Sequence, residues 1–245
     1  MMKHDALPAD LVALFSRSPE LPSPLPADPF PLFAAWFADE KQSARTPNPD
    51  AMSLATIDAD GSPSVRIVLC RGIDAARGSV TFFTNYAGRK GQALHAQPRA
   101  ALCFHWDDSD RQVRLEGAVT RCTPAESDAY FYSRRWESRL SAWTSHQSQP
   151  TAGRAALLAQ MQEVIRELGL DPKTLVAQGE RAPIPRPAHW GGFRFHAHRV
   201  ELWLGGHGRL HDRAAWTRPV VVAPSLAEDS PPPEFGAWTN SRLQP

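Results

Sequence analysis

Two adjacent cations in the segment from Phe82 to Gly91 stand where a strand-like run meets a glycine-containing turn. Arg89 and Lys90 follow that turn at the start of an expected helix, and Thr84 adds a hydroxyl. A helix N-terminus supplies oriented N–H donors, and arginine binds phosphate through a bidentate fork. The segment could therefore cradle a phosphate, although taken alone it is better explained by a solvated Arg-Lys pair on an ordinary turn.

Two arginines on the hydrophobic run 66–71 strengthen the case for an anion site. Side chains alternate along a strand, so Arg66 and Arg71 fall on opposite faces. A charge on such a strand is costly unless it pairs with a carboxylate or a bound anion, although an arginine at a strand end can also extend into water. Each face is thus expected to carry one cation that needs a partner.

A second cluster combines a phenol, a guanidinium and a hydroxyl. Tyr130, Arg134 and Ser138 are spaced by four, so they share one face if a helix continues through them. Such a face could bind one anion, and a plain surface helix explains the same spacing about as well.

A third cluster follows a glycine-rich turn, where Arg209, His211 and Arg213 fall within five positions. His207 and His211 resemble a metal pair, but the glycines break any helix there and no third ligand is suitably spaced, so we expect no metal site. The sequence also lacks a Rossmann glycine fingerprint, a Walker loop and a nucleophile elbow, which weakens nicotinamide, nucleotide and hydrolase interpretations.

The elements that must position these clusters are mainly short strands. Asp28-Pro29 can cap a helix that carries Leu32, Phe33, Trp36 and Phe37 at helical spacing. Loop 58–61 ends in glycine and predicts a hairpin between the first two strands. The runs rich in β-branched and aromatic residues are Met52–Ile57, Val65–Cys70, Val80–Thr84, Ala100–Trp106 and Val113–Cys122.

Helices then interrupt the strands. Thr123 to Glu126 reads as a capping box that opens a helix to about Tyr132. A second helix is expected over 151–168, with Ala155, Leu158, Met161, Ile165 and Leu168 on one face. An antiparallel strand pair is expected over 192–204. Strands joined by tight turns favour a mainly β fold with helices (α+β), a closed or partly closed antiparallel barrel, over a parallel sheet.

Charge and composition restrict the partners. Lys and Arg total 27 against 26 Asp and Glu, a net charge of +1, and no run is long enough to span a bilayer, so neither nucleic acid nor a membrane is expected as a partner. Three widely separated cysteines imply no disulfide framework and fit a reducing compartment, so we expect a cytoplasmic protein. Residues 18–32 hold six prolines. We therefore expect a flexible proline-rich leader over 1–27 and one domain over 28–245.

Taken in order, these segments resemble the pyridoxamine 5'-phosphate oxidase family over 28–245. The resemblance implies an antiparallel split β-barrel of the FMN-binding type, flanked by helices, in a homodimer with FMN between the subunits. It also implies oxidation of pyridoxamine or pyridoxine 5'-phosphate to pyridoxal 5'-phosphate, a vitamin B6 reaction, with O2 as acceptor and H2O2 as product. The segments that carry it are Arg66–Leu69, Thr84-Asn85, Arg89-Lys90, Arg111–Val113, Tyr130–Ser138, Trp143, Gln147-Ser148, Trp190–Arg194, Trp203 and Arg209–Arg213.

The resemblance also assigns roles. Arg209 and His211 would be catalytic and would lie over the substrate ring. The residues that would hold FMN are Arg66, Ile67, Val68, Leu69, Arg71, Phe83, Thr84, Arg89, Lys90, Gln112, Gln147, Ser148, Trp203 and Arg213. Those that would bind the substrate are Arg71, Tyr130, Arg134, Ser138, Arg209 and His211. Two separate anion clusters are what a phosphorylated cofactor and a phosphorylated substrate require.

Departures from the family pattern fall mainly on the substrate side. Arg71 stands where the family usually has lysine, Arg139 stands where glutamine is usual, and the family's N-terminal Arg-x-x-Tyr segment has no counterpart. Residues 219–238 form a longer, proline-rich insertion. Two alternatives stay open: an oxidase of the same fold that acts on another reduced ring, of the phenazine-biosynthesis type, and a non-catalytic carrier of flavin or pyridoxal phosphate.

Overall fold

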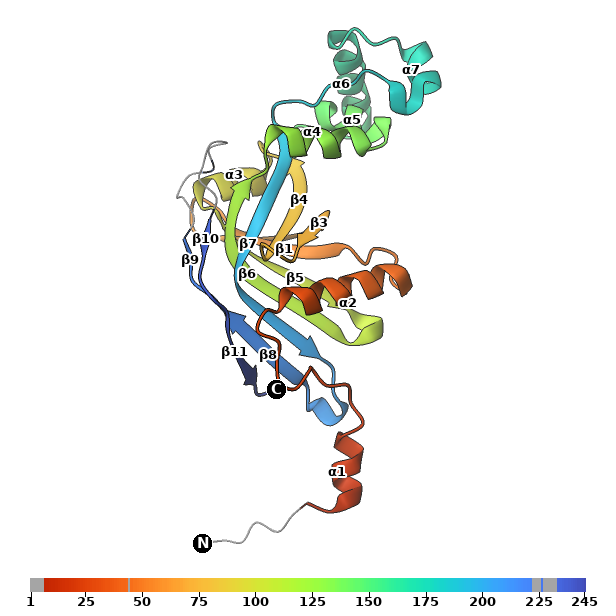
Figure 1. Cartoon of the computed structure of the whole chain (residues 1–245). Helices are drawn as coiled ribbons and strands as arrows, with labels where there is room; N and C mark the ends of the chain where they lie inside the picture. Colours follow the sequence, from red (N-terminus) through yellow and green to blue (C-terminus); the bar gives the residue numbers. More distant parts are fainter. Residues whose placement is uncertain (1–6, 44, 222–225, 227–232) are drawn as a thin grey trace.

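A computed structural model gives the positions of residues 7–43, 45–221, 226 and 233–245. Within these residues, nine strands form one antiparallel sheet in the order β11-β8-β7-β6-β5-β1-β2, with β4 beside β7 and β3 beside β4. Figure 1 shows the sheet curled into a partly closed barrel with helices around it, which confirms the predicted fold class. The strands of this sheet are β1 Ala51–Ile57, β2 Pro63–Leu69, β3 Gly72–Asp74, β4 Ser79–Asn85, β5 Arg99–Trp106, β6 Arg111–Arg121, β7 Trp190–Leu204, β8 Asp212–Thr217 and β11 Thr239–Leu243.

The first strands follow the predicted pattern, each within two residues of its expected bounds. β1 and β2 pair as a hairpin, as expected from loop 58–61. Gly61 has a φ of +85°, which glycine adopts without strain, and the Asp58 N–H donates to the Ser62 carbonyl at 2.9 Å. The hairpin therefore forms because its turn carries the right residue at the left-handed position.

The region predicted as a strand pair over 192–204 is instead one continuous strand, β7. The alternation of buried residues changes parity between Phe195 and Val200, which suggested two strands. A β-bulge explains the change: Gly117 of β6 pairs with Ala197 and Glu116 pairs with Arg199, so His198 is an extra residue. Along its other edge, β7 pairs first with β4 and then with β8.

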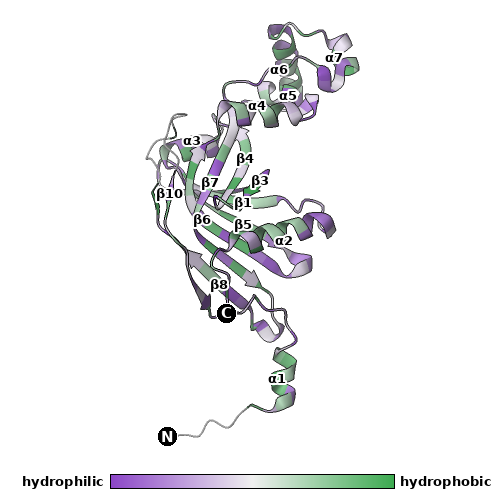
Figure 2. Ribbon diagram, in the orientation of Figure 1, coloured by the Kyte–Doolittle hydropathy of each residue, from purple (hydrophilic) through white to green (hydrophobic). Residues whose placement is uncertain are grey.

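Helix α2 (Phe30–Ser43) closes one side of the barrel core (Figure 2). Phe30, Phe33 and Trp36 are buried, and the Phe33 ring lies 5.2 Å from that of Phe104 on β5. Burying one such ring stabilises the fold by roughly 1.5–3 kcal/mol, so this contact fixes the helix on the sheet. Leu32 and Phe37, also predicted for this face, are only half-buried.

A helical lobe stands on one end of the barrel (Figure 1). The predicted capping box is present, because the Thr123 hydroxyl accepts from the Glu126 N–H and the Glu126 carboxylate accepts from the Thr123 N–H. The face predicted on the long helix is partly wrong, since Leu158 is 54% exposed and Val164 is buried instead. The helices are α3 Arg89–Ala96, which leaves the barrel rim, and in the lobe α4 Pro124–Ser133, α5 Trp136–Thr144, α6 Arg154–Glu167 and α7 Pro172–Gln178.

The leader is attached to the barrel well before residue 28. Residues 1–6 lie outside the described part; α1 (Ala9–Phe15) follows, and then an extended stretch reaches α2. Leu21 is 2% exposed within the core, its N–H donates to Asp212, and the Pro26 carbonyl accepts from the Trp216 indole at 2.8 Å. The stretch expected to be flexible is thus packed from Leu21 onward, because its carbonyls pair with side chains of the sheet.

The insertion 219–238 lies partly outside the described residues. Its described ends form β9 (Val220–Val221) and β10 (Glu234–Phe235), which pair with each other. The Arg218 guanidinium, just before the insertion, lies 4.0 Å from the Phe235 ring and 4.3 Å from the Trp238 ring, so cation–π contacts hold the two ends of the insertion together.

Candidate functional site

A cavity of about 550 Å³ opens where the helical lobe meets strands β2 and β4. Four cationic side chains and no carboxylate are among the described residues that line it. The cavity is therefore suited to anionic ligands. Its lining consists of Ile67, Val68, Leu69, Arg71, Phe83, Thr84, Asn85, Lys90, Tyr130, Arg134, Arg135, Ser138, Ser141, Ala142, Ser145, Gln147 and Trp190.

One group of cationic and polar side chains lies where β4 turns into α3. It consists of Lys90, Thr84 and Gln147 and is called the first pole of the cavity. The Lys90 ammonium donates to Gln147 Oε1 at 2.6 Å and to Thr84 Oγ1 at 3.2 Å. Burial, and then the charge of Arg66, lowers the pKa of Lys90. The tight turn requires Gly91, where a Cβ atom would lie 2.2 Å from the Tyr86 carbonyl oxygen. The predicted turn thus brings Lys90, Thr84 and Gln147 together at one end of the cavity.

Arg66 and Arg89 stand behind this pole without lining the cavity. Arg66 lacks a carboxylate partner among the described residues; it donates to Thr56 Oγ1 at 2.7 Å and to Ser64 Oγ, and burial lowers its pKa. Arg89 is held by Asp58 at 2.5 Å, and its backbone N–H donates to Ser148 Oγ at 3.3 Å. The two guanidinium groups thus support the pole from the β1–β2 hairpin and from α3.

The second pole gathers Tyr130, Arg134 and Ser138, although the helix does not continue through all three. α4 ends at Ser133, Arg134 has an extended backbone (φ −81°, ψ 151°), and α5 begins at Trp136. The break turns the arginine into the cavity, where all three side chains still meet. Arg134 Nη1 is buried and has no hydrogen-bond partner among the described residues. Burial lowers the pKa of Arg134, so a bound anion would satisfy both the donor and the charge.

Three nearly parallel rings form the wall between the poles. The Phe83 ring lies 4.0 Å from Tyr130 and 5.7 Å from Trp190. Arg134 lies over Trp190 at 4.6 Å, and Arg71 lies over Tyr130 at 5.9 Å. A flat ring placed in this cavity would therefore meet an aromatic and cationic wall.

The remaining predicted residues lie together at the opposite end of the sheet. Gln112, Trp203 and Arg213 stand abreast on β6, β7 and β8, and the His211 ring lies 4.7 Å from Trp203. Arg213 pairs with Glu201 at 2.7 Å. Arg209 has a φ of +64° in the short turn η3 (His207–Arg209), a strained value for a non-glycine residue.

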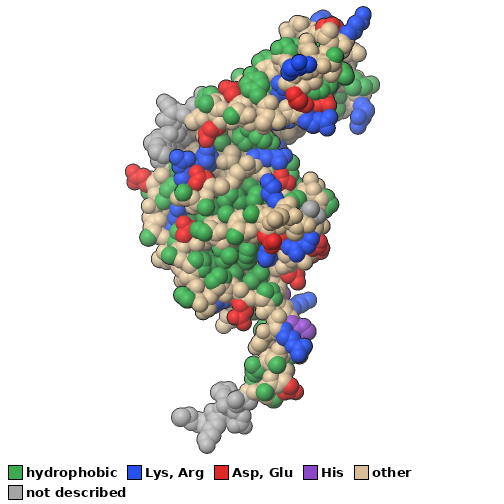
Figure 3. All heavy atoms as spheres, turned by 45° about the vertical axis from the view of Figure 1, so that its right-hand side comes forward, with side chains coloured by type: hydrophobic (Ala, Val, Ile, Leu, Met, Phe, Trp, Pro, Cys, Tyr) green, Lys and Arg blue, Asp and Glu red, His purple; other side chains and the backbone are tan. Residues whose placement is uncertain are grey.

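These two groups are too far apart to touch one small ligand within a single chain. Trp190 at the cavity and Trp203 at the far group lie on the same strand, β7, so roughly 40 Å of extended backbone separates them. Val65 and Ile67 on β2 are 68% and 64% exposed, and Figure 3 shows hydrophobic side chains gathered over the face below the helical lobe. Such exposed apolar surface is typical of an interface.

Sequence reasoning missed several residues of the cavity and misjudged one. Asn85 donates to the Ser145 carbonyl and accepts from the Ala87 N–H, which shapes the β4–α3 turn. Trp190 precedes two glycines, a signal that could have marked it as a wall residue. Arg139, expected near the substrate, is 3% exposed and donates to the Glu180 and Ala182 carbonyls, so it joins α5 to the 179–182 turn rather than lining the cavity.

Comparison with protein families matches two regions of the chain. Residues 38–166 match the model described as pyridoxamine 5'-phosphate oxidase. Residues 190–245 match the model described as the pyridoxine 5'-phosphate oxidase C-terminal dimerisation region. Both anion poles lie in the first match together with Gln112, whereas the residues of the far group on and near β7 and β8 lie in the second.

Individual relatives agree with these matches. The chain is 44% identical over 237 residues to the pyridoxine/pyridoxamine 5'-phosphate oxidase of Bordetella petrii, covering 97% of this chain and 99% of the relative. It is 48% identical over 189 residues to the enzyme of the same name from Cupriavidus metallidurans, covering 77% and 82%.

Two solved structures share the fold. PhzG of Burkholderia lata 383, in complex with tetrahydrophenazine-1-carboxylic acid, superposes with a TM-score of 0.71 at 28% identity, covering 90% of this chain and 94% of that one. A pyridoxamine 5'-phosphate oxidase-related, FMN-binding protein from Nostoc punctiforme has a TM-score of 0.64 at 16% identity, covering 90% and 100%, and this likeness supports the fold alone.

Proposed function

Because this chain belongs to the pyridoxamine 5'-phosphate oxidase family, we propose that it oxidises pyridoxine 5'-phosphate or pyridoxamine 5'-phosphate to pyridoxal 5'-phosphate. Pyridoxine 5'-phosphate and O2 would give pyridoxal 5'-phosphate and H2O2. With pyridoxamine 5'-phosphate, one water is also consumed and ammonia is released. The observation that carries the proposal is the cavity with two separate cationic poles.

FMN is the cofactor of this family, and the first pole fits its phosphate. Lys90 and Thr84 would donate to phosphate oxygens at the base of the cavity, with Arg66 and Arg89 behind them. Gln147 would have to yield its hydrogen bond from Lys90, which is an inexpensive exchange because a charge-assisted bond to phosphate replaces it. The exposed face of Ile67 to Leu69 would lie along the flavin ring. When bound, FMN supplies the hydride acceptor for the substrate carbon and returns its electrons to O2.

The second pole would hold the substrate phosphate. Arg134 offers a buried donor that no described residue satisfies, while Tyr130 and Ser138 add two hydroxyls. Binding there would fix the distance from the phosphate to the reacting carbon and so orient the carbon toward the flavin. The aromatic wall excludes water on one side of the substrate ring.

A second copy of the chain would complete each site. The C-terminal dimerisation match supports a homodimer, and the far group cannot reach the cavity of its own chain. We therefore assign Gln112, Trp203 and Arg213 to the flavin of the partner's cavity. Arg209 and His211 would lie over the substrate there, as the sequence resemblance implies.

A second candidate substrate is a reduced tricyclic ring that carries a carboxylate. Two observations favour it: PhzG, whose structure holds such a ring, shares this fold at 28% identity, and Arg71 replaces the usual lysine at the cavity. Arginine offers a planar fork that suits a carboxylate better than lysine does.

Aerobic turnover tests the choice. Purified protein with FMN is given pyridoxine 5'-phosphate or pyridoxamine 5'-phosphate, and pyridoxal 5'-phosphate and H2O2 are followed together. Formation of both products at a steady rate in equal amounts is the expected result. If FMN binds and neither substrate turns over, the vitamin B6 assignment is wrong and the tricyclic substrate becomes the leading candidate.

A further inference from the structure

A buried carboxylate at the far end of the sheet holds one arginine of the far group. Glu201 Oε1 accepts from Arg213 Nη2 at 2.7 Å and from Arg213 Nε at 3.2 Å. The other oxygen, Oε2, accepts from Arg114 Nη1 at 3.4 Å. The Glu201 side chain is 5% exposed, against 25% for Arg213 and 48% for Arg114. A carboxylate buried this deeply is costly unless its oxygens are paired, so the two arginines explain why it is tolerated.

Strand register places Glu201 on the same face of the sheet as the far group. It lies opposite Arg114 on β6, and it precedes Trp203, which lies opposite Arg213 on β8, by two residues. Side chains two apart on a strand share a face, and Leu202 between them is buried in the barrel core on the other face. Glu201 is therefore a diagonal neighbour of Arg213, within reach of a long side chain on the next strand.

The contacts of Arg213 fix the orientation of its guanidinium group. A guanidinium has five N–H donors. Glu201 takes one donor of Nε and one of Nη2, and the Gln244 carbonyl takes one of Nη1 at 3.0 Å. One donor on each terminal nitrogen has no partner among the described residues. The side chain is thus held from two sides, while part of its donor set stays open to a ligand.

We infer that Glu201 is a positioning residue for FMN, because it fixes the Arg213 guanidinium before the flavin of the partner's cavity binds. The inference rests on the proposed function, which assigns Arg213 to that flavin. An unrestrained arginine loses side-chain freedom when it binds a ligand. An orientation that is set in advance removes part of this cost, so the same hydrogen bonds give a higher affinity.

Charge compensation alone would give the opposite result. FMN carries a phosphate, so removal of a nearby carboxylate would strengthen FMN binding if Glu201 did no more than reduce the positive charge at Arg213. Loss of a positioning contact weakens FMN binding instead. The sign of the change in FMN affinity therefore separates the two roles.

The experiment measures FMN affinity by flavin fluorescence titration, and urea unfolding of the FMN-free protein measures stability separately. Glu201→Ala should weaken FMN binding about tenfold, and Glu201→Gln, which keeps an acceptor for Arg213, should weaken it only about threefold. At saturating FMN the substrate KM should stay within twofold in both variants. The matched control is Glu116→Ala. Glu116 lies 3.8 Å from Arg114 and 3.7 Å from Arg199 but has no contact with Arg213, so FMN affinity should stay within twofold.

A double-variant cycle keeps the inference testable if Glu201→Ala does not fold or dimerise. Arg213→Ala should weaken FMN binding by itself, and Glu201→Gln should have no further effect in that background, because its influence passes through the arginine. Losses that multiply in the double variant would overturn the role of Glu201. Unchanged or stronger FMN binding in Glu201→Gln would also overturn it.

Failure of the proposed function gives a different result. If Arg213→Ala leaves FMN affinity unchanged, the far group is not part of a flavin site, and the inference falls together with that assignment. If Arg213→Ala weakens FMN binding and neither Glu201 variant does, the flavin assignment stands and only the positioning role is wrong. A lack of turnover with both vitamin B6 substrates alters neither result, because the titration requires no substrate.

Discussion

The two ends of the sheet carry similar residues in opposite electrostatic states. At the cavity end, cations line the cavity, and one buried donor of Arg134 has no partner within the described part of the chain. At the β7–β8 end, Arg213 is already paired with Glu201, which is 5% exposed at its side chain, and Trp203 lies against His211. The cavity end is built to receive an anion, whereas the other end presents an ordered surface. Under the proposed function each end would supply half of a site, and this can be tested by altering one end at a time.

The largest effect on activity is expected when the cavity end is substituted in one subunit and the β7–β8 end in the other. Arg134→Ala and His211→Ala should each lower kcat/KM by roughly 10–100-fold, because each removes one charge-assisted or polar contact. In co-expressed mixtures, a mixed dimer has one site with both changes and one site with neither. Random pairing should restore about a quarter of the unsubstituted activity.

The control for this complementation uses two changes at the same end. Arg134→Ala mixed with Tyr130→Ala leaves one altered residue in every cavity, so no activity should return. Recovery in the control, or its absence in the first pair, would show that the two ends do not meet across a dimer.

The next largest effect should distinguish the two poles of the cavity, because one is expected to set FMN affinity and the other substrate KM. Arg89→Ala should weaken FMN affinity roughly 10-fold, because it removes a cation held by Asp58 beside the first pole. Arg134→Ala should instead raise the KM for a phosphorylated substrate and leave FMN affinity unchanged. Flavin fluorescence titration and steady-state kinetics on both variants measure this split. If both variants changed FMN affinity and substrate KM to the same extent, the two poles would not bind separate ligands.

A smaller effect concerns pH at the first pole. Lys90 has a lowered pKa because of burial and the nearby Arg66 charge. A lysine is cationic below its pKa, so FMN affinity should fall as pH rises through that value, and at a lower pH than for an ordinary lysine near 10.4. Lys90→Arg keeps its charge over the pH range in which the lysine loses it, so this variant should flatten the decline in FMN affinity several-fold. Identical pH profiles for the two proteins would contradict a phosphate contact by Lys90.

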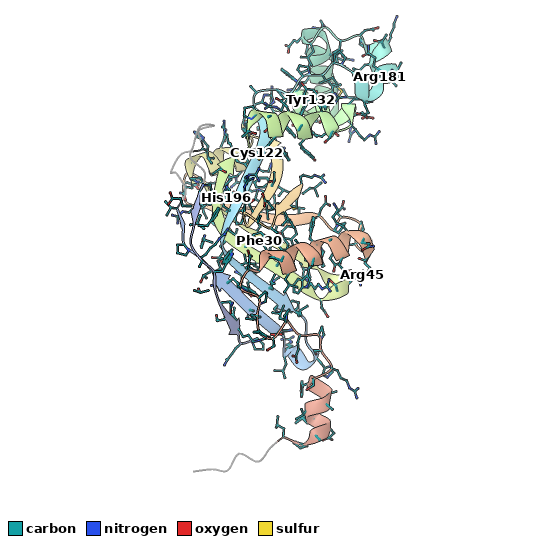
Figure 4. The ribbon with its side chains drawn as sticks, in the orientation of Figure 1. Phe30, Arg45, Cys122, Tyr132, Arg181 and His196 are labelled. Carbon is teal, nitrogen blue, oxygen red and sulfur yellow. The ribbon has the colours of Figure 1, made fainter. Side chains whose placement is uncertain are left out.

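A substitution midway between the two ends should have the smallest effect on ligand binding at either end, and its main effect should be on stability. His196, labelled on β7 in Figure 4, is 3% exposed and contacts Thr120 at 2.9 Å, and burial lowers its pKa to about 4. The unfolded chain protonates this residue first, so the stability it contributes is complete above about pH 6.5 and is lost as pH falls toward 4. The loss should reach about 3 kcal/mol, measured by urea unfolding.

His196→Gln should remove this pH dependence without favouring either end. FMN affinity and substrate KM should change together or not at all, because β7 supports both. His95→Gln on α3, an exposed position, provides the control and should keep the full pH dependence. A selective loss of one end in His196→Gln would mean that β7 does not hold the two ends equally.

Local chemistry made much of the fold predictable. Gly61 at a left-handed position and the Thr123–Glu126 capping box each determine their own turn, and so the sequence indicates them directly. The bulge at His198 depends on the register of β6, which lies some eighty residues earlier, so the sequence alone suggested two strands. The break at Arg134 has no proline or glycine to announce it.

The sequence indicated which residues belong to the candidate site better than it indicated where those residues lie relative to one another. Resemblance named the residues of both poles and of the far group, but the separation of the poles from the far group follows from the path of β7. The ion-pair partner of Arg71, Asp50, was not predicted, because a carboxylate just before a strand carries no signal of its own. The two side chains lie 2.6 Å apart because the β1–β2 hairpin brings them together.

Strand β7 has a consequence for which changes in length this chain can tolerate. An insertion of one residue would turn every following side chain to the opposite face, and Trp203 would point away from Gln112 and Arg213. An insertion of two would restore the faces but shift the cavity wall against the far end by a full pleat repeat. The number of residues in β7 is therefore fixed by the pairing at both of its ends. Changes in length are therefore expected to be tolerated outside β7 and away from the cavity, as in the insertion 219–238.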